Sequence, residues 1–246
     1  MRIAISGAAN TGKSTLLKSF LYTWDNYKTP EKTYRDIISE ENLEHSSQTT
    51  ANNQTKILNS LIEQQKDHAS LSEKVVHDRC ALDALAYTLW CNVKNVDGFD
   101  SEFVKEQIAA ARESMRTLDI IFLCKFDEKQ VIVNDGSRDA DLEYIKEVDN
   151  IFESLYQQYS QNLSADVFFP KGDSPAVIKL PNSPQERIDL IAEYVAPDGG
   201  MHSEESSILD PSNLDNLEQL LKQQISAKES EEADKALFEK FKSDTN

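Results

Sequence analysis

The sequence predicts an α/β fold in which a parallel β-sheet is covered by helices on both faces. Short apolar runs of strand length stand at residues 3–5, 74–78, 119–124 and 177–180, and stretches with helical spacing of apolar residues lie between them. This regular alternation is typical of parallel sheets, because each return of the chain to the same edge needs a crossover connection.

Each element is expected from its own pattern. The unbroken apolar run at residues 119–124 is the clearest strand, since a parallel strand that is covered on both faces has no polar side. The segment 29–38 is ambiguous, and we interpret it as a short strand that ends near Asp36. Turns are expected at residues 135–136 and 181–184. Helices are expected at residues 15–21, 54–62, 81–90, 103–118, 141–159 and 184–193.

The composition changes near residue 195, which predicts a domain at residues 1–195 and an appendage at residues 196–246. Residues 197–200, Pro-Asp-Gly-Gly, are typical of a linker. The appendage holds twelve acidic and five basic residues, and its leucine spacing from residue 214 onward predicts amphipathic helices. We expect these helices either to pack back on the domain or to pair with another copy of the chain or with a partner.

The charge of the chain bears on its partners. The 246 residues include 26 Lys and Arg against 43 Asp and Glu, a formal net charge of −17. This charge repels polyanions at long range, so it disfavours nucleic acid as a substrate without excluding a local basic groove. No apolar run reaches the roughly 18 residues that span a bilayer, no signal peptide is recognised, and three cysteines lack metal-ligand spacing. We therefore expect a cytoplasmic protein with no membrane partner.

The strongest functional signal is the pattern Gly-x-x-x-x-Gly-Lys-Ser at residues 7–14, between the first strand and the first helix. Its glycines let the backbone curl so that successive amides point at phosphate oxygens, and the amino terminus of the helix favours negative charge. Lys13 is expected to reach the β- and γ-phosphates of ATP, and Ser14 to offer its hydroxyl to Mg²⁺. The pattern is a phosphate-binding loop (P-loop), so we expect a three-layer P-loop NTPase fold. The predicted nucleotide-binding residues are Gly7, Asn10, Thr11, Gly12, Lys13, Ser14 and Thr15.

Two further positions are candidates for handling phosphate and metal. Asp78 ends a predicted buried strand, at the sheet edge where ligands bind in this class of fold, and could orient Mg²⁺ or its water. Arg79 follows it and could brace a phosphate with its guanidinium, although a strand-ending ion pair is the simpler alternative. His77 alternates with Asp78 along the strand, so we expect a packed histidine on the opposite face.

Arginine and aspartate recur in two less regular segments. Arg138 lies in a polar stretch where it could fold over the donor phosphates during transfer, the alternative being a solvated turn. Arg35 is a candidate substrate-binding residue, and Asp36 could act as general base toward an acceptor hydroxyl. A surface salt bridge is an equally good interpretation of Asp36.

With these residues in place, the chain resembles the P-loop nucleoside and nucleotide kinase group, which includes thymidylate kinase-like and deoxynucleoside kinase-like proteins. It is most similar to the small NadR-like kinases that bacteriophages often encode. The resemblance implies that Asp78 and Arg79 face phosphates and metal, that Arg138 belongs to a lid, and that residues 183–187 lie beside the adenine. The segments that carry it are residues 7–14, 33–36, 76–87, 135–138 and 183–187.

Three functions follow as hypotheses. The first is an ATP-Mg²⁺-dependent kinase that transfers the γ-phosphoryl group to a nucleoside or a (deoxy)nucleoside monophosphate. The second keeps the enzyme but places the acceptor hydroxyl on DNA or RNA, as in 5-hydroxymethyluracil DNA kinases and 5′-hydroxyl polynucleotide kinases. The third is a non-catalytic nucleotide-binding regulatory module that docks through its C-terminal helices.

Overall fold

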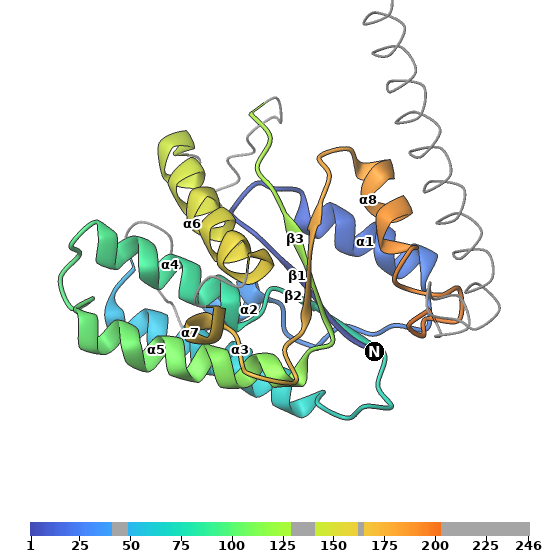
Figure 1. The fold of residues 1–246 in the computed structure, drawn as a ribbon, viewed down its shortest axis with the longest axis horizontal. Coiled ribbons are helices and arrows are strands. Elements are labelled where there is room, and N and C mark those ends of the chain that lie inside the picture. The colour runs from blue at the N-terminus through green and yellow to red at the C-terminus, as the bar shows by residue number, and fades with distance from the viewer. Residues whose placement is uncertain (41–48, 129–140, 162–164, 203–246) are drawn as a thin grey trace, which may run out of the picture. The chain divides into compact units, whose positions relative to one another are not determined.

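The computed structural model describes residues 1–40, 49–128, 141–161 and 165–202 (Figure 1). Its centre is a parallel sheet in the strand order β2-β1-β3-β4, which confirms the predicted architecture. The strands are β1 (Arg2–Ser6), β2 (Val75–Asp78), β3 (Ile120–Cys124) and β4 (Ala176–Leu180). Within the first compact unit, Met1–Gly200, β1 lies between β2 and β3, so the carboxyl ends of three neighbouring strands meet at one edge.

Alternation along the strands assigns the two faces of the sheet. In β1, Ile3 and Ile5 pack in one apolar cluster, and Ala4 between them belongs to another. The first cluster is covered by α1 (Lys13–Thr23) and α8 (Pro184–Ile191). The opposite face is covered by α3 (Ala51–Asp67), α4 (Ala81–Val93), α5 (Ser101–Ser114) and α6 (Leu142–Ser160), so the domain has three layers (Figure 1).

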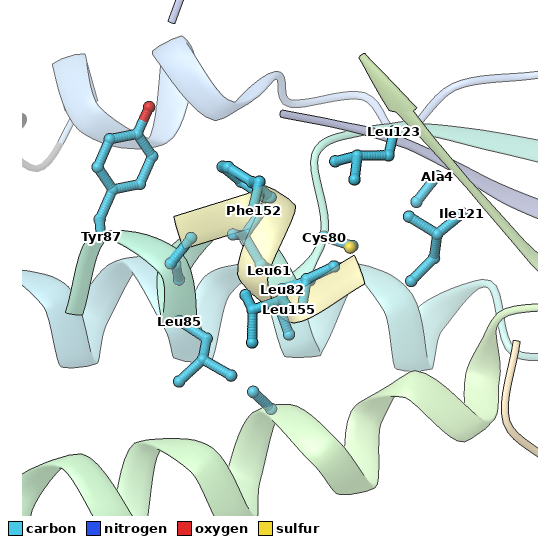
Figure 2. Packing of buried hydrophobic residues seen from close by; sticks show 14 of the residues in the cluster. Ala4, Leu61, Cys80, Leu82, Leu85, Tyr87, Ile121, Leu123, Phe152 and Leu155 are labelled. Carbon is cyan, nitrogen blue, oxygen red and sulfur yellow. The ribbon is translucent and has the colours of Figure 1, made fainter. Parts of the chain in front are cut away.

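The larger cluster fills the space between the sheet and the second set of helices. Leu61 of α3, Leu82 of α4 and Leu155 of α6 meet there, and all are almost fully buried (Figure 2). Tyr87 and Leu85 leave α4 on opposite sides (Figure 2). The side of Tyr87 is the one that faces the site described below. The short helices η2 (Met115–Thr117) and α7 (Ala165–Phe168) complete this layer.

The predicted strand near Asp36 is wrong, because the segment ends in a helix, α2 (Tyr34–Glu40). Thr33 and Asp36 form reciprocal hydrogen bonds: the Thr33 amide donates to the Asp36 carboxylate at 2.8 Å, and the Asp36 amide donates to the Thr33 hydroxyl at 3.3 Å. This is a capping box, which satisfies two amide groups at the start of a helix. The local capping pattern therefore decides the secondary structure of this segment.

Beyond α8 the chain stays attached to the domain as far as Gly200. The Trp24 indole donates to the Ala196 carbonyl at 3.0 Å, and the Tyr27 hydroxyl donates to the Gly199 carbonyl at 2.9 Å. The helices predicted from residue 214 onward and the predicted lid at residues 135–138 lie outside the described residues. Among the helices that are described, none is long and apolar enough to cross a membrane.

Candidate phosphate-binding site

The loop between β1 and α1 has the backbone that the glycine pattern predicts. Gly7 has φ of 137°, and a Cβ atom there would lie 2.3 Å from the Cys124 carbonyl oxygen, so only glycine fits. Gly12 caps α1 in the left-handed region at φ of 83°, without a side-chain cap. The first amides of α1 therefore have no intrahelical partner and point into the loop.

The carbonyl groups of the loop are held by specific donors. The Lys13 ammonium donates to the Gly7 carbonyl at 2.7 Å and also to the Ala8 carbonyl. The Arg187 guanidinium of α8 donates to the Thr11 carbonyl at 2.7 Å. These bonds fix the orientation of the Gly7, Ala8 and Thr11 carbonyl groups in the loop.

Lys13 is a buried cation at the centre of this loop. It is only 6% exposed, and its ammonium also lies 3.3 Å from the Thr11 hydroxyl. Burial, and after it the nearby Arg79 guanidinium, lowers the pKa of Lys13 to about 7. An anion in the cradle would oppose both effects and favour the charged form of Lys13.

Arg79 faces the same loop from the end of β2. Its backbone is left-handed at φ of 77°, which is unusual for a bulky residue, and its amide donates to the Ile5 carbonyl at 3.1 Å. The guanidinium lies 3.4 Å from the Gly7 carbonyl oxygen and 4.4 Å from the ring centroid of Tyr34 in α2. Tyr87 of α4 lies 5.7 Å away. These cation–π contacts hold Arg79 beside the loop between two helices.

Ser14 and Asp78 are the predicted metal ligands. Ser14 lies in the first turn of α1, and Asp78 is paired in register with Ile5 just before the loop begins. A hydroxyl and a carboxylate are oxygen donors of the kind that Mg²⁺ prefers, so their chemistry fits this ion. Within the described ranges no group of three or more His, Cys, Asp or Glu side chains could hold a metal by itself, so further oxygens would come from nucleotide and water.

Asp36 is described as an exposed residue in the first turn of α2. Hydrogen bonds from the Thr33 side chain and backbone hold the pKa of Asp36 below its ordinary value. The carboxylate thus has a structural partner already, and its role as general base stays a prediction. Arg35 shares this helix, but its side chain is not among those described, and Arg138 lies outside the described residues.

A cavity of about 260 Å³ opens beside the P-loop. It adjoins Gly12 and Thr15 of the loop region and Arg187 of α8, whose Nε atom also donates to the Pro181 carbonyl at 2.8 Å. Its position suits the base of a nucleotide whose phosphates occupy the cradle. The lining residues are Gly12, Thr15, Leu16, Ser19, Asp127, Asn182, Pro184 and Arg187.

Two residues of the site were not singled out from the sequence. Arg187 was part of a segment carried by the resemblance, but its bond to the Thr11 carbonyl joins positions 176 residues apart. Asp83 is completely buried and contacts both the start of the P-loop and Arg79. Its signal in the sequence was its place three residues after Cys80 at a helix start, which is the spacing of a capping box.

Known proteins share this architecture. A family model described as an AAA domain matches residues 2–167. The crystal structure of NadR protein in complex with NR is 16% identical with a TM-score of 0.55, and the match covers 78% of this chain and 50% of that one. This chain therefore spans half the length of that structure. None of the curated proteins searched matches the chain.

A second similar structure is matched over nearly the whole of its own length. Deoxyadenosine kinase from M. mycoides with bound dATP is 19% identical, with a TM-score of 0.53 over 78% of this chain and 98% of that chain. The same enzyme with the products dCMP and a flexible dCDP is 20% identical, with a TM-score of 0.51 and coverage of 78% and 97%. At these identities the shared property is the fold, and the expected likeness to the P-loop nucleoside kinase group is confirmed at that level.

Proposed function

Because the chain belongs to this AAA domain family, we propose that it is a kinase that transfers the γ-phosphoryl group of ATP to a nucleoside or a (deoxy)nucleoside monophosphate. The observation that carries the proposal is the buried Lys13 ammonium, which bonds the Gly7 carbonyl beside the partly buried Arg79 guanidinium and forms no ion pair of its own among the described residues. Burying cations is costly unless a negative partner arrives, and the polyphosphate of a nucleotide is such a partner.

The donor would bind in two parts. Amides of residues 8–15 would hold its phosphates, and the cavity next to Arg187 would take its base. Ser14 and Asp78 would hold Mg²⁺. When bound, this ion would neutralise charge on the phosphate oxygens. Because Arg187 bonds the Thr11 carbonyl and lines the cavity, the phosphate and base subsites share one residue.

The chain's own residues would then stabilise the transfer. Lys13 would neutralise negative charge on the β- and γ-phosphate oxygens, and Arg79 would approach the transferred group from the other side of the loop. Arg138 is proposed to close over the donor from the lid. For a hydroxyl acceptor, Asp36 is the proposed general base, whereas an acceptor phosphate is already anionic and needs none.

The acceptor is proposed to be a small molecule. The aromatic rings of Tyr34 and Tyr87 border Arg79 and offer flat apolar surface beside it. The NadR structure contains NR, and the deoxyadenosine kinase structures contain deoxynucleotides, which supports an acceptor with a nucleoside moiety. The net charge of −17 gives a nucleic-acid acceptor less support.

The test is a panel of nucleosides and nucleoside monophosphates incubated with ATP, Mg²⁺ and the full chain. At least one acceptor should be phosphorylated, and a Lys13→Met variant should transfer about 10²–10³-fold more slowly, because the transition state loses one preorganised charge. A DNA or RNA oligonucleotide with hydroxyl ends serves as the competing acceptor. Turnover of the oligonucleotide alone would reject the small-molecule acceptor, and absence of all turnover would reject the kinase.

A further inference from the structure

We propose that Asp83 is a positioning residue for phosphoryl transfer, because one carboxylate fixes both the first amide of the P-loop and the Arg79 guanidinium. The inference rests on the proposed kinase function. Asp83 itself is too deeply buried to touch substrate, since its side chain is 1% exposed. Its effect must therefore pass through the groups that it holds.

Each carboxylate oxygen of Asp83 accepts two hydrogen bonds. Oδ1 accepts from the Gly7 amide at 3.2 Å and from the Arg79 guanidinium at 3.2 Å. Oδ2 accepts from the Ser6 hydroxyl at 2.7 Å and from the Cys80 amide at 3.0 Å. The four donors come from the end of β1, the start of the P-loop and the connection between β2 and α4. A single side chain thus joins three segments that meet at the carboxyl edge of the sheet.

The two oxygens of Asp83 contact different parts of the molecule: Oδ2 bonds structural groups, and Oδ1 bonds groups of the proposed site. Oδ2 closes the capping box of α4 and ties that helix to β1. Oδ1 faces the functional groups, and its contact with Arg79 is an ion pair between positions four residues apart. Together with the stacked Tyr34 ring, this ion pair limits Arg79 to one place beside the Gly7 carbonyl.

The Gly7 amide is fixed by the same oxygen. Because the Gly7 amide donates to Asp83, it does not point into the cradle, and the inward turn of the loop begins after it. The Gly7 carbonyl is then held from the other direction by Lys13 and Arg79. The Asp83 carboxylate therefore fixes both the direction in which the P-loop begins and the position of the Arg79 guanidinium.

Gln65 of α3 provides a matched control. It is 1% exposed, and its Oε1 atom accepts from the Ala81 amide at 2.9 Å, so it also supports the first turn of α4. Its Nε2 atom donates to the Ser114 carbonyl at 3.1 Å. None of its described hydrogen bonds reaches the P-loop or Arg79. Gln65→Met therefore disturbs the same helix start without touching the site.

The experiment compares Asp83→Asn with Gln65→Met in the full chain. Asparagine cannot accept all four bonds, since one oxygen becomes an NH₂ group. We expect Asp83→Asn to lower kcat about 10²-fold, the usual effect of a small misplacement of a catalytic group. Gln65→Met should keep kcat within about threefold of wild type, even if its melting temperature falls as much as that of Asp83→Asn. Equal losses of kcat in the two variants would overturn the positioning role.

A double-mutant cycle with Arg79→Gln tests the route of the effect. The part of the effect that passes through Arg79 is absent from the Arg79→Gln background, so adding Asp83→Asn there should lower kcat by clearly less than the loss of about 10²-fold expected in wild type, and the remainder reports the route through Gly7. A full additional 10²-fold loss would mean that Asp83 acts independently of Arg79, contrary to the proposal. Should Asp83→Asn fail to fold, Ser6→Ala takes its place. The Ser6 hydroxyl holds the same carboxylate at 2.7 Å, so its loss lets Oδ1 move away from Gly7 and Arg79 and should still lower kcat severalfold. An unchanged kcat would contradict the proposal.

Failure of the kinase assignment is distinguishable from failure of this inference. If the wild type phosphorylates no acceptor, the kinase is rejected, and the positioning role is measured through calorimetric binding of ADP with Mg²⁺. Asp83→Asn should then weaken ADP binding about tenfold, equivalent to about 1.4 kcal/mol, while Gln65→Met leaves it unchanged. Equal affinities in the wild type and both variants would overturn the inference.

Discussion

The two edges of the sheet use buried charge in different ways. At the amino edge, the Asp119 carboxylate accepts from the Arg2 amide at 2.7 Å and from its guanidinium at 2.6 Å, so one cation meets one anion. At the carboxyl edge, Arg79 pairs with the buried Asp83 carboxylate, with Asp78 nearby, whereas Lys13 bonds backbone carbonyls and a hydroxyl and no described carboxylate. The Arg2 cation is thus paired directly within the chain, whereas Lys13 has no direct anionic partner among the described residues.

This difference teaches how buried charge relates to role. Removing one partner of a closed pair is destabilising, because it leaves the other group buried and unpaired. A buried cation with incomplete compensation costs stability and is retained where it meets a substrate. We therefore expect substitutions at the amino edge to change stability and substitutions at the carboxyl edge to change function.

The largest expected effect is that of Lys13→Met at the carboxyl edge. Phosphoryl transfer should fall about 10²–10³-fold because the ammonium no longer offsets charge in the transition state. The free energy of unfolding at pH 7 should stay the same or rise, since methionine removes a cation whose burial lowers its pKa to about 7. Steady-state kinetics and urea unfolding measure the two. A loss of stability as severe as the loss of activity would contradict the comparison.

Gly7 lies at the carboxyl edge and Gly199 near the amino edge, so the same substitution to alanine at each position compares an effect on nucleotide binding with an effect on stability. Gly7→Ala puts a Cβ atom 2.3 Å from the backbone oxygen of Cys124, so the loop must move and nucleotide affinity should fall at least about tenfold. Gly199→Ala, with φ of 76°, puts a Cβ atom 2.6 Å from the end of the exposed Asn26 side chain and 2.9 Å from the ring of the buried Tyr27, so this turn must shift. It should cost about 1–2 kcal/mol of stability. Calorimetric nucleotide affinity should be unchanged in Gly199→Ala, and a matching loss there would break the comparison.

Asp119→Asn should destabilise the domain by about 2 kcal/mol at pH 7, the range for hydrogen bonds to a charged group. Burial alone would raise the pKa of Asp119, but its bonds with Arg2 outweigh burial and hold that pKa below the ordinary value of 3.8. The stabilisation is therefore present above the unfolded pKa and is lost as the pH falls through the folded one. Urea unfolding at pH 7 and pH 3 should show the difference between wild type and variant shrinking at the lower pH. Turnover well below the melting temperature should be unchanged.

The smallest expected effect is that of Arg187→Met. The variant loses the bond to the Thr11 carbonyl but keeps much of the apolar contact of the side chain. Nucleotide affinity should fall about tenfold, or 1.4 kcal/mol, with kcat nearly unchanged, because the proposed role of Arg187 is to hold the donor site and not to contact the transferred group. A large loss of kcat at saturating ATP would instead place Arg187 in the transfer step.

Much of the fold could be predicted because the responsible signals are local. The four strands are predicted by short apolar runs. The P-loop is predicted by its glycine pattern, because the backbone at Gly7 has no room for a Cβ atom. His77 was expected to pack on the face opposite to Asp78, and it is 2% exposed with its ring 6.0 Å from that of His68. Burial, and then His68, lowers the pKa of His77 to about 4.

The features that escaped prediction depend on contacts between distant segments or on competing local patterns. Nothing near Arg187 in the sequence signals its bond to Thr11, and the contact of Asp83 with Gly7 needs β1 and α4 to be placed first. The helix at Asp36 was missed because β-branched and aromatic residues around it resemble a strand, while Thr33 supplies the capping box that decides the outcome. Tyr87 is buried in the core, and its ring centroid also lies 5.7 Å from the Arg79 guanidinium, a contact that only the folded chain creates.

The most direct test of the central claim is the gain in unfolding free energy that ATP with Mg²⁺ confers on three proteins: wild type, Asp119→Asn and Lys13→Met. A ligand at about 100 times its dissociation constant stabilises the folded state by about 2.7 kcal/mol. We predict this gain for the wild type and for Asp119→Asn alike, and a much smaller one for Lys13→Met at the same nucleotide concentration. No gain in the wild type, or an equal gain in Lys13→Met, would contradict the assignment of the carboxyl edge to phosphate binding.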